Sequence, residues 1–204
     1  MASEDAFRAV AASLSAGRAV VFPTDTVYGI GVAVGLAPSP AEIYAVKRRD
    51  PEKAIPWLVG RPAAISFYGS DVPDYAKRLA EEFWPGPLTL IVKAAANVPA
   101  AFAAENGTLA LRMPDDETAL SLMERVGFPL ATSSANLQGH TPPRKFSEVD
   151  PAVLSAVGAS MGDDELRSGI SSTIVDCTGE SPVLVREGTV SRADIERALS
   201  CGAN

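Results

Sequence analysis

The sequence predicts an α/β protein built on a mixed, open sheet with helices on its faces. Short β-branched runs alternate with segments whose apolar residues recur at helical spacing, which is typical of layered α/β domains. Nearby strand pairs after Thr108 and after Ser172 make the sheet mixed rather than purely parallel. The 204 residues, 47% hydrophobic and 21% charged, suffice for a sizeable core. Without a repeat or linker, the chain is expected to form one domain over residues 1–204.

The N-terminal segment is predicted to be a helix followed by a buried strand. Apolar residues recur at helical spacing at Phe7, Val10, Ala11 and Leu14. A β-branched run at 19–22 then stops at Pro23 and opens into hydroxyls, a carboxylate and close-set glycines. This pattern indicates a strand that delivers polar groups to a pocket, although a plain strand–turn–strand with tightly packed glycines fits it as well.

A second helix is predicted from Pro40 to about Val46. Ser39, Pro40 and Glu42 stand in the order of a capping box. A basic cluster follows at the helix C-terminus, at Lys47, Arg48, Arg49 and Lys53. Such a cluster can form a local positive site for a phosphate ligand, or simply complement the carbonyl groups that end a helix.

The remaining elements follow from periodicity and turn residues. Strands are expected at 57–59, 88–92, 108–112, 129–132, 173–176 and 183–186. Helices are expected at 74–83, 117–126, about 147–157 and 191–199.

Composition excludes several classes of protein. A net charge of −7 argues against a chain that mainly wraps a phosphate backbone. Cys177 and Cys201 are too few and too isolated for a disulfide scaffold or a thiolate metal site, and His140 is the single histidine. No apolar run approaches a membrane span, and the N-terminus carries acids where a secretory signal has bases, so a cytoplasmic protein is expected.

Standard nucleotide and hydrolase motifs are absent. Gly29, Gly31 and Gly35 form G-x-G-x-x-x-G, which is one residue longer than the dinucleotide fingerprint, and there is no P-loop. Ser133 and Ser134 do not lie in G-x-S-x-G, which argues against a serine hydrolase.

Hydroxyls and arginines recur where predicted strands begin or end. They occur at Thr24, Thr26, Arg112, 132–136, 171–173 and Arg186. Each hydroxyl could simply cap local backbone. Because ligands bind beyond strand ends in open α/β sheets, several such groups together predict a polar, anion-binding crevice.

Several of these segments carry a family resemblance. The motifs are 23–31 (PTDTVYGIG), Lys47-x-Arg49-x-x-x-Lys53, 84–89 (WPGPLT), Leu109-x-Leu111-Arg112-x-Pro114, 132–136 (TSSAN), 172–176 (STIVD) and Val185-Arg186-x-Gly188. In this order they resemble the YrdC/Sua5 family, the threonylcarbamoyl-AMP synthases, in its short single-domain form. The resemblance covers about residues 5–199 and implies a twisted YrdC-like sheet around a positively charged cavity.

The resemblance implies an activity and its substrates. A member condenses L-threonine, bicarbonate or CO2, and ATP into threonylcarbamoyl-AMP and pyrophosphate, the first step of making threonylcarbamoyladenosine in tRNA. Mg²⁺ is expected to arrive with ATP, without a dedicated protein cage. A threonylcarbamoyl-transferase complex would accept the product. Whether tRNA also binds directly is left open.

The resemblance also implies roles for residues. Lys47, Arg49 and Lys53 are expected to face the ATP phosphates as the catalytic cations. Further nucleotide contacts are expected from Thr108, Ser134, Asn136, Arg144 and Arg186. Arg112 is expected to clamp the threonine carboxylate. The remaining amino-acid site is expected to comprise Thr24, Thr26, Tyr28, Thr132 and Ser172.

Two other functions remain open at this point. An RNA-binding module would use the same basic cavity without turnover, but the acidic net charge argues against it. A carbamoyl-transfer domain, as in hydrogenase-maturation proteins, would use carbamoyl phosphate instead of threonine, but the zinc-finger and acylphosphatase regions that accompany such domains are missing.

Overall fold

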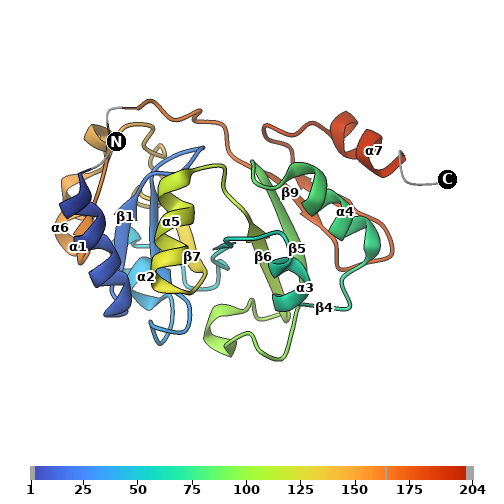
Figure 1. Ribbon diagram of the computed structural model, residues 1–204, viewed down its shortest axis with the longest axis horizontal. Coiled ribbons are helices and arrows are strands. Elements are labelled where there is room, and N and C mark those ends of the chain that lie inside the picture. Colours follow the sequence, from blue (N-terminus) through green and yellow to red (C-terminus); the bar gives the residue numbers. More distant parts are fainter. Residues whose placement is uncertain (1–2, 164, 201–204) are drawn as a thin grey trace.

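The computed structural model of the protein describes residues 3–163 and 165–200, and its centre is one ten-stranded sheet (Figure 1). The strand order is β10-β9-β5-β6-β3-β7-β2-β1-β8, and β4 pairs with the β5 strand. The pairs β3–β6, β5–β9 and β1–β8 are parallel and the others are antiparallel, so the predicted mixed sheet is confirmed. The strands are β1 (Val20–Phe22), β2 (Gly29–Ala33), β3 (Trp57–Leu58), β4 (Gly69–Ser70), β5 (Leu88–Ala94), β6 (Thr108–Arg112), β7 (Leu130–Ser134), β8 (Ala159–Ser160), β9 (Thr173–Asp176) and β10 (Val183–Arg186).

The helices lie between and beyond the strands. They are α1 (Glu4–Ser15), α2 (Ala41–Lys47), α3 (Ala64–Tyr68), α4 (Asp74–Phe83), α5 (Glu117–Val126), α6 (Pro151–Ala156) and α7 (Arg192–Ser200), with short 3₁₀ turns at Ala100–Phe102 and Phe146–Glu148. Side-chain caps start several of them: Ser3 accepts a hydrogen bond from Ala6 N, and Asp116 accepts one from Ala119 N.

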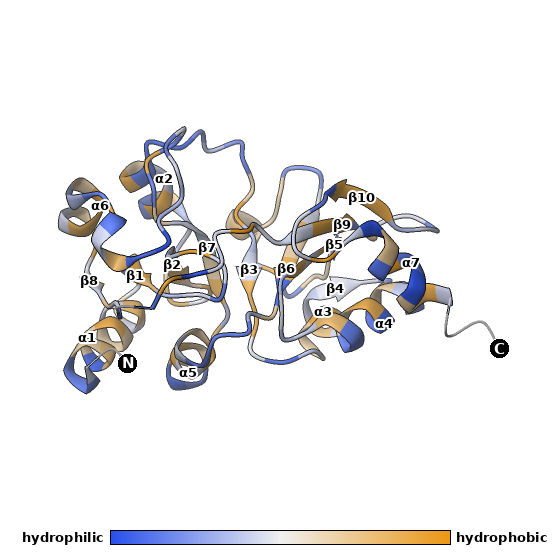
Figure 2. Ribbon diagram, turned by 90° about the horizontal axis from the view of Figure 1, so that it is seen from above, coloured by the Kyte–Doolittle hydropathy of each residue, from blue (hydrophilic) through white to orange (hydrophobic). Residues whose placement is uncertain are grey.

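The two faces of the sheet are covered unequally. One hydrophobic core packs a single face against α2, α3, α4, α6 and α7, and a second core packs the opposite face against α1 and α5. In Figure 2, α1 and α5 lie below the strands of the left half, whereas on the right α3 and α4 lie below the strands and α7 lies beside them at the right-hand end. Among the described helices, none covers the opposite face of β5, β6 and β9.

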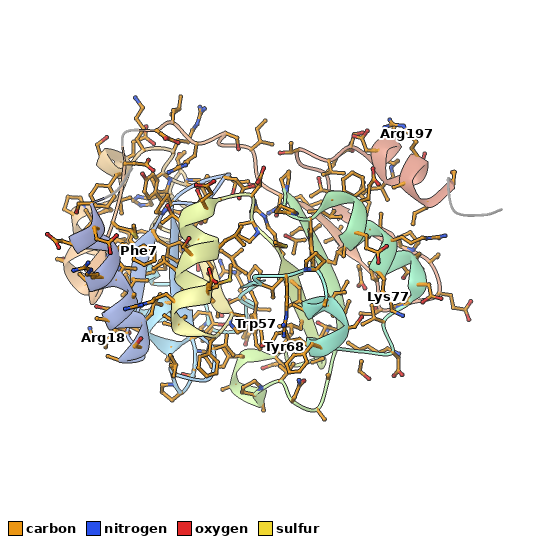
Figure 3. All side chains as sticks on the ribbon, viewed as in Figure 1. Phe7, Arg18, Trp57, Tyr68, Lys77 and Arg197 are labelled. Atoms are coloured by element: carbon orange, nitrogen blue, oxygen red, sulfur yellow. The ribbon has the colours of Figure 1, made fainter. Side chains whose placement is uncertain are left out.

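The shortest of the central strands, β3, joins the two halves of the sheet. Trp57 pairs with Leu111 on β6 and with Ala131 on β7, and Leu58 forms the second pair on each side. The Trp57 ring is fully buried and meets Tyr68 edge-on at 5.3 Å between ring centroids; both side chains are labelled in Figure 3.

Two local predictions were wrong. Glu42 does not close a capping box on Ser39; its carboxylate accepts hydrogen bonds from the Ala19 backbone N–H (2.6 Å) and the Arg18 side chain (2.9 Å), because these donors approach it from the neighbouring segment. The expected helix at 147–157 is divided, because Asp150 caps a new helix with Pro151 at its first position.

The sequence also left some elements unpredicted, among them strands β2, β4 and β8 and the helix α3. Cys201 lies outside the described residues, and Cys177 is buried and unpaired. Within the described ranges, no helix is both long and apolar enough to cross a membrane.

Candidate active site

The face of β6 that no described helix covers carries two polar side chains. Alternation along the strand turns Leu109 and Leu111 into the core and places Thr108 and Arg112 on the uncovered face. The two polar residues stand four positions apart, about 13 Å along an extended strand. Thr108 is half-buried and donates to the side-chain oxygen of Asn106 at 2.7 Å. Thr108 and Arg112 therefore lie at opposite ends of β6 on the same face of the sheet.

Arg112 is held by a network that we call the arginine cluster: Arg112, Asp25, Thr26 and Gly86. Its Nε donates to the Gly86 carbonyl oxygen and its Nη1 to Thr26 Oγ1, both at 3.1 Å. Its Nη2 donates to both carboxylate oxygens of Asp25. Burial lowers the pKa of Arg112, and the Asp25 carboxylate opposes that shift. The cluster therefore holds the guanidinium of Arg112 and the carboxylate of Asp25 side by side, largely shielded from water.

A second guanidinium reaches the same face from the edge of the sheet. Ser172 shares a hydrogen bond of 2.9 Å with the hydroxyl of Thr89 on β5. Arg186 on β10 donates to the Ser172 carbonyl oxygen from Nε at 3.2 Å and from Nη2 at 2.7 Å. Ser172 is buried, whereas Arg186 is exposed. The pairing of β5, β9 and β10 thus brings Thr89, Ser172 and Arg186 together on the uncovered face.

Lys47 does not point its charge toward solvent. Its ammonium donates to the carbonyl oxygen of Ser134, to the carbonyl oxygen of Asn136 at 2.6 Å and to Asn136 Oδ1 at 3.3 Å. The whole residue is 2% exposed. We call Lys47, Ser134 and Asn136 the lysine turn, because the ammonium fixes the turn that follows β7. Burial, and secondarily the charge of Arg49, lowers the pKa of Lys47 to about 8.

Lys47 is therefore expected to titrate near pH 8 in the folded protein. The pKa of an unfolded lysine is about 10.4, so the unfolded chain binds more protons between these values and the free energy of unfolding gained from this group rises with pH over that window. Lysine side-chain NMR over pH 6–11 measures the transition, and its loss in Lys47→Met assigns it. A Lys47 signal that titrates above pH 10 would contradict the prediction.

Close strand packing connects the lysine turn to the arginine cluster. Thr132 on β7 faces Gly29 and Gly31 on β2, and a Cβ added to either glycine would lie 2.9 or 2.8 Å from its side chain. The glycines therefore allow the two strands to hold a buried threonine between them. Thr24 lies beside Gly29, accepts backbone N–H bonds from its own turn and meets Thr26 Oγ1 at 3.2 Å.

Residues 161–163 and 165–172, which we call the crossing segment, pass over this turn. The Gly169 backbone N–H donates to the Thr26 carbonyl oxygen at 2.8 Å. Arg167 anchors the segment: it forms ion pairs with Asp163 at 2.5 Å and with Asp116 at 3.4 Å, and all three side chains are less than 10% exposed. The two carboxylates outweigh the effect of burial and raise the pKa of Arg167, whereas burial raises the pKa of Asp116.

Tyr28 and Arg144 attach to the same segment. The Tyr28 hydroxyl donates to the Asp163 carbonyl oxygen at 3.1 Å, and the Arg167 guanidinium lies 5.6 Å from the Tyr28 ring centroid. The Arg144 Nε donates to the Arg167 carbonyl oxygen at 3.0 Å. Both predicted site residues therefore hold the crossing segment in this structure.

The other two predicted cations lie after α2. Arg48 ends the helix with a left-handed φ of 51°, and Arg49 follows, half-buried, with its Nη2 at 3.4 Å from the Ala54 carbonyl oxygen. Lys53 is exposed, and within residues 3–163 and 165–200 its ammonium has no hydrogen-bond or ion-pair partner. In the same ranges, no group of three or more His, Cys, Asp and Glu side chains could hold a metal ion.

A groove of considerable size lies elsewhere. It has a volume of about 800 Å³ between α3 and α5 and is lined by Arg61, Phe67, Glu124 and Phe128 among others. None of the predicted site residues lines it. The polar clusters described above are therefore kept as the candidate site.

Sequence reasoning missed the carboxylates and one arginine of this site. Asp25 belongs to the motif at 23–31, but no role was predicted for it, and Asp116, Asp163 and Arg167 were not singled out. For Asp116 a signal existed, since Asp directly before a helix is a favoured N-cap. For Arg167 no local pattern indicated burial: Asp163 is only four positions away, but its other buried partner, Asp116, lies 51 positions away in the sequence.

Comparison with known proteins relates the whole chain to one family. The Sua5/YciO/YrdC family model, described as Telomere recombination, matches residues 12–188. A Mycobacterium tuberculosis relative is 37% identical over 193 residues, 94% of this chain and 88% of its own length. The threonylcarbamoyl-AMP synthase of Alkalilimnicola ehrlichii is 34% identical over 156 residues, 76% of this chain and 80% of its own length.

Solved structures agree with the fold. Sua5 of Pyrococcus abyssi, complexed with L-threonine, superposes with a TM-score of 0.88 at 32% identity over 94% of this chain, which spans 56% of the length of that protein. Escherichia coli YciO superposes with a TM-score of 0.77 at 24% identity and is covered over 90% of both chains. The expected YrdC-like fold is confirmed, and the match to YciO has the length of the short form.

Proposed function

Since this chain belongs to the Sua5/YciO/YrdC family, we propose that it is a threonylcarbamoyl-AMP synthase, which condenses L-threonine, bicarbonate or CO2, and ATP. The observation that carries the proposal is the buried Arg112, whose guanidinium faces the uncovered side of the sheet among hydroxyls. The similarity to the threonylcarbamoyl-AMP synthase of A. ehrlichii, which this chain covers over 80% of its length, supports the same activity.

The arginine cluster is the proposed threonine site. The guanidinium of Arg112 binds the amino-acid carboxylate through Nη1, because a hydrogen bond between two charged groups is stronger than one between neutral groups. The Thr26 hydroxyl, 3.1 Å from Nη1, is placed to share that carboxylate. The proposed site is completed by Thr24, Tyr28, Thr132 and Ser172. The crystal complex of P. abyssi Sua5 with L-threonine supports this substrate.

The lysine turn and the cations around it form the proposed nucleotide site. Arg49 and Lys53 contact the phosphates, and the further groups proposed to contribute are Thr108, Ser134, Asn136, Arg144 and Arg186. Lys47 remains part of the proposed catalytic set, and its bonds to two carbonyl oxygens support a role in positioning the turn. Mg²⁺ enters as part of the ATP substrate and neutralises phosphate oxygens.

The proposed reaction needs no protein nucleophile. The ammonium group of bound threonine first loses a proton to solvent. The amine nitrogen then attacks the carbon of CO2 and releases a second proton to solvent, which gives a carbamate. A carbamate oxygen then attacks the α-phosphorus of ATP, the bond from that phosphorus to the β-phosphate oxygen breaks, and pyrophosphate leaves. The protein contributes by holding two anions next to each other and by stabilising the charge on pyrophosphate.

Pyrophosphate release tests the activity directly. The purified protein is expected to release pyrophosphate from ATP when L-threonine and bicarbonate are both present, and only at background rate when either is left out. Mass spectrometry of the nucleotide should identify threonylcarbamoyl-AMP. Release that does not depend on threonine would reject the proposal, and salt-sensitive RNA binding without turnover would favour a binding module instead.

We also propose the setting of the reaction. The enzyme acts in the cytoplasm and passes its adenylate to a threonylcarbamoyl-transferase complex that modifies tRNA. The acidic net charge of −7 supports transfer through that complex rather than tight binding of tRNA by this chain.

A further inference from the structure

Asp25 is the carboxylate closest to the group that recognises the substrate. It lies between the two buried hydroxyls of Thr24 and Thr26, and both of its carboxylate oxygens accept hydrogen bonds from Arg112 Nη2. Its side chain is 15% exposed, against 8% for Arg112. Asp25 is therefore the more accessible member of the pair, although most of its surface is withdrawn from water.

The donors of Arg112 are nearly all assigned. A guanidinium has five N–H groups. One is used on the Gly86 carbonyl oxygen, one on Thr26 and two on the Asp25 carboxylate, so a single Nη1 hydrogen is without an acceptor among the described residues. An incoming carboxylate can take this hydrogen together with the Thr26 hydroxyl and leave the Asp25 pair in place.

This arrangement matches an α-amino acid in its zwitterionic form. The ammonium nitrogen of such a molecule is two bonds from its carboxylate carbon. With the carboxylate on Arg112 Nη1 and Thr26, the ammonium lies within reach of a carboxylate that flanks the same guanidinium. The other carboxylates near the cluster, Asp116 and Asp163, are already paired with Arg167.

We propose that Asp25 binds the α-ammonium group of the amino-acid substrate, beside the Arg112 guanidinium that binds its carboxylate. Asp25 thereby selects α-amino acids over carboxylic acids that lack the amine. This inference rests on the proposed function, because it names a residue for the same substrate. In this proposal the positive Arg112 and the negative Asp25 are complementary to the carboxylate and the ammonium group of the free amino acid.

The test compares two ligands on two proteins. L-Threonine and (R)-3-hydroxybutyrate, which is threonine without its amino group, are titrated by ligand-observed NMR into the wild type and into Asp25→Asn. Asparagine keeps an oxygen acceptor for Arg112 but loses the charge. The threonine dissociation constant is expected to rise about tenfold or more, as loss of a hydrogen-bonded charge pair implies, while that of the hydroxy acid changes less than about twofold.

Other results would overturn the proposal. Equal weakening of both ligands would mean that Asp25 only orients Arg112, and tighter binding of both would mean that Asp25 competes with the substrate carboxylate. Asp115→Asn is the matched control. Asp115 is exposed and does not contact Arg112, so this substitution removes one negative charge next to Asp116 and leaves the arginine cluster unchanged. If the wild type itself binds no threonine, the proposed function fails; if it binds threonine and Asp25→Asn binds it equally well, only the subsite fails.

Discussion

Replacement of Arg112 by alanine is expected to raise the threonine KM by about 100-fold, equivalent to about 2.7 kcal/mol, because a charge-assisted hydrogen bond to the substrate carboxylate and the positive charge that attracts it are lost in a site sheltered from water. The dissociation constant for ATP should change by less than about threefold, since the cations proposed for the phosphates come from other elements. Pyrophosphate release against threonine concentration measures the first value, and calorimetry with a nonhydrolysable ATP analogue measures the second.

The control for this substitution must separate recognition from packing. Arg112 also donates to the Gly86 carbonyl oxygen and neutralises Asp25, so its loss leaves a buried carboxylate unpaired. Arg112→Lys keeps the positive charge but not the planar fork, and it should fold while binding threonine weakly. Equal loss of threonine and ATP affinity in both variants would contradict the assigned role.

Replacement of Arg167 by alanine is expected to lower the free energy of unfolding by about 3–5 kcal/mol, because it leaves two buried carboxylates without their partner. Asp163 and Asp116 are 8% and 7% exposed, so water cannot readily take over the lost contacts. Urea denaturation measures the global effect. Hydrogen exchange at Gly169, whose N–H reaches the Thr26 carbonyl oxygen, should report earlier release of the crossing segment.

A surface ion pair provides the comparison. Arg8 and Glu4 meet at 3.1 Å on α1, but their side chains are 69% and 71% exposed. Arg8→Ala should therefore cost less than about 0.5 kcal/mol. A loss from Arg167→Ala as small as that from Arg8→Ala would show that the crossing segment is held by its backbone bonds alone.

Local patterns were sufficient for much of the fold. The helices at 74–83 and 117–126 and the strands at 108–112, 173–176 and 183–186 have the predicted bounds, because periodic side chains and adjacent turn residues define both ends. Strand β2 was not predicted, because Gly29 and Gly31 weaken the local preference for a strand. It forms because β1 and β7 bond to it on both sides, and no window of sequence contains that information.

The same limit applies to the candidate site. Hydroxyls and arginines at strand ends located Arg112, Ser172 and Arg186 on one face, as the topology of an open sheet requires. The ion pair between Arg112 and Asp25 joins residues 87 positions apart, and the bond from Lys47 to the Ser134 carbonyl oxygen also spans 87 positions. Sequence alone therefore predicted hydroxyls and cations of the candidate site, but not the carboxylates that the fold places against these cations.

The two residue pairs that β3 makes with each neighbour form the narrow waist of the sheet. Arg112 and Ser172 belong to the half on one side, and Ser134 belongs to the half on the other. A short strand resists bending less than a long one, because fewer ladder bonds must adjust. A small hinge movement at Trp57–Leu58 would consequently change the gap between the two proposed substrates while every longer strand stays intact.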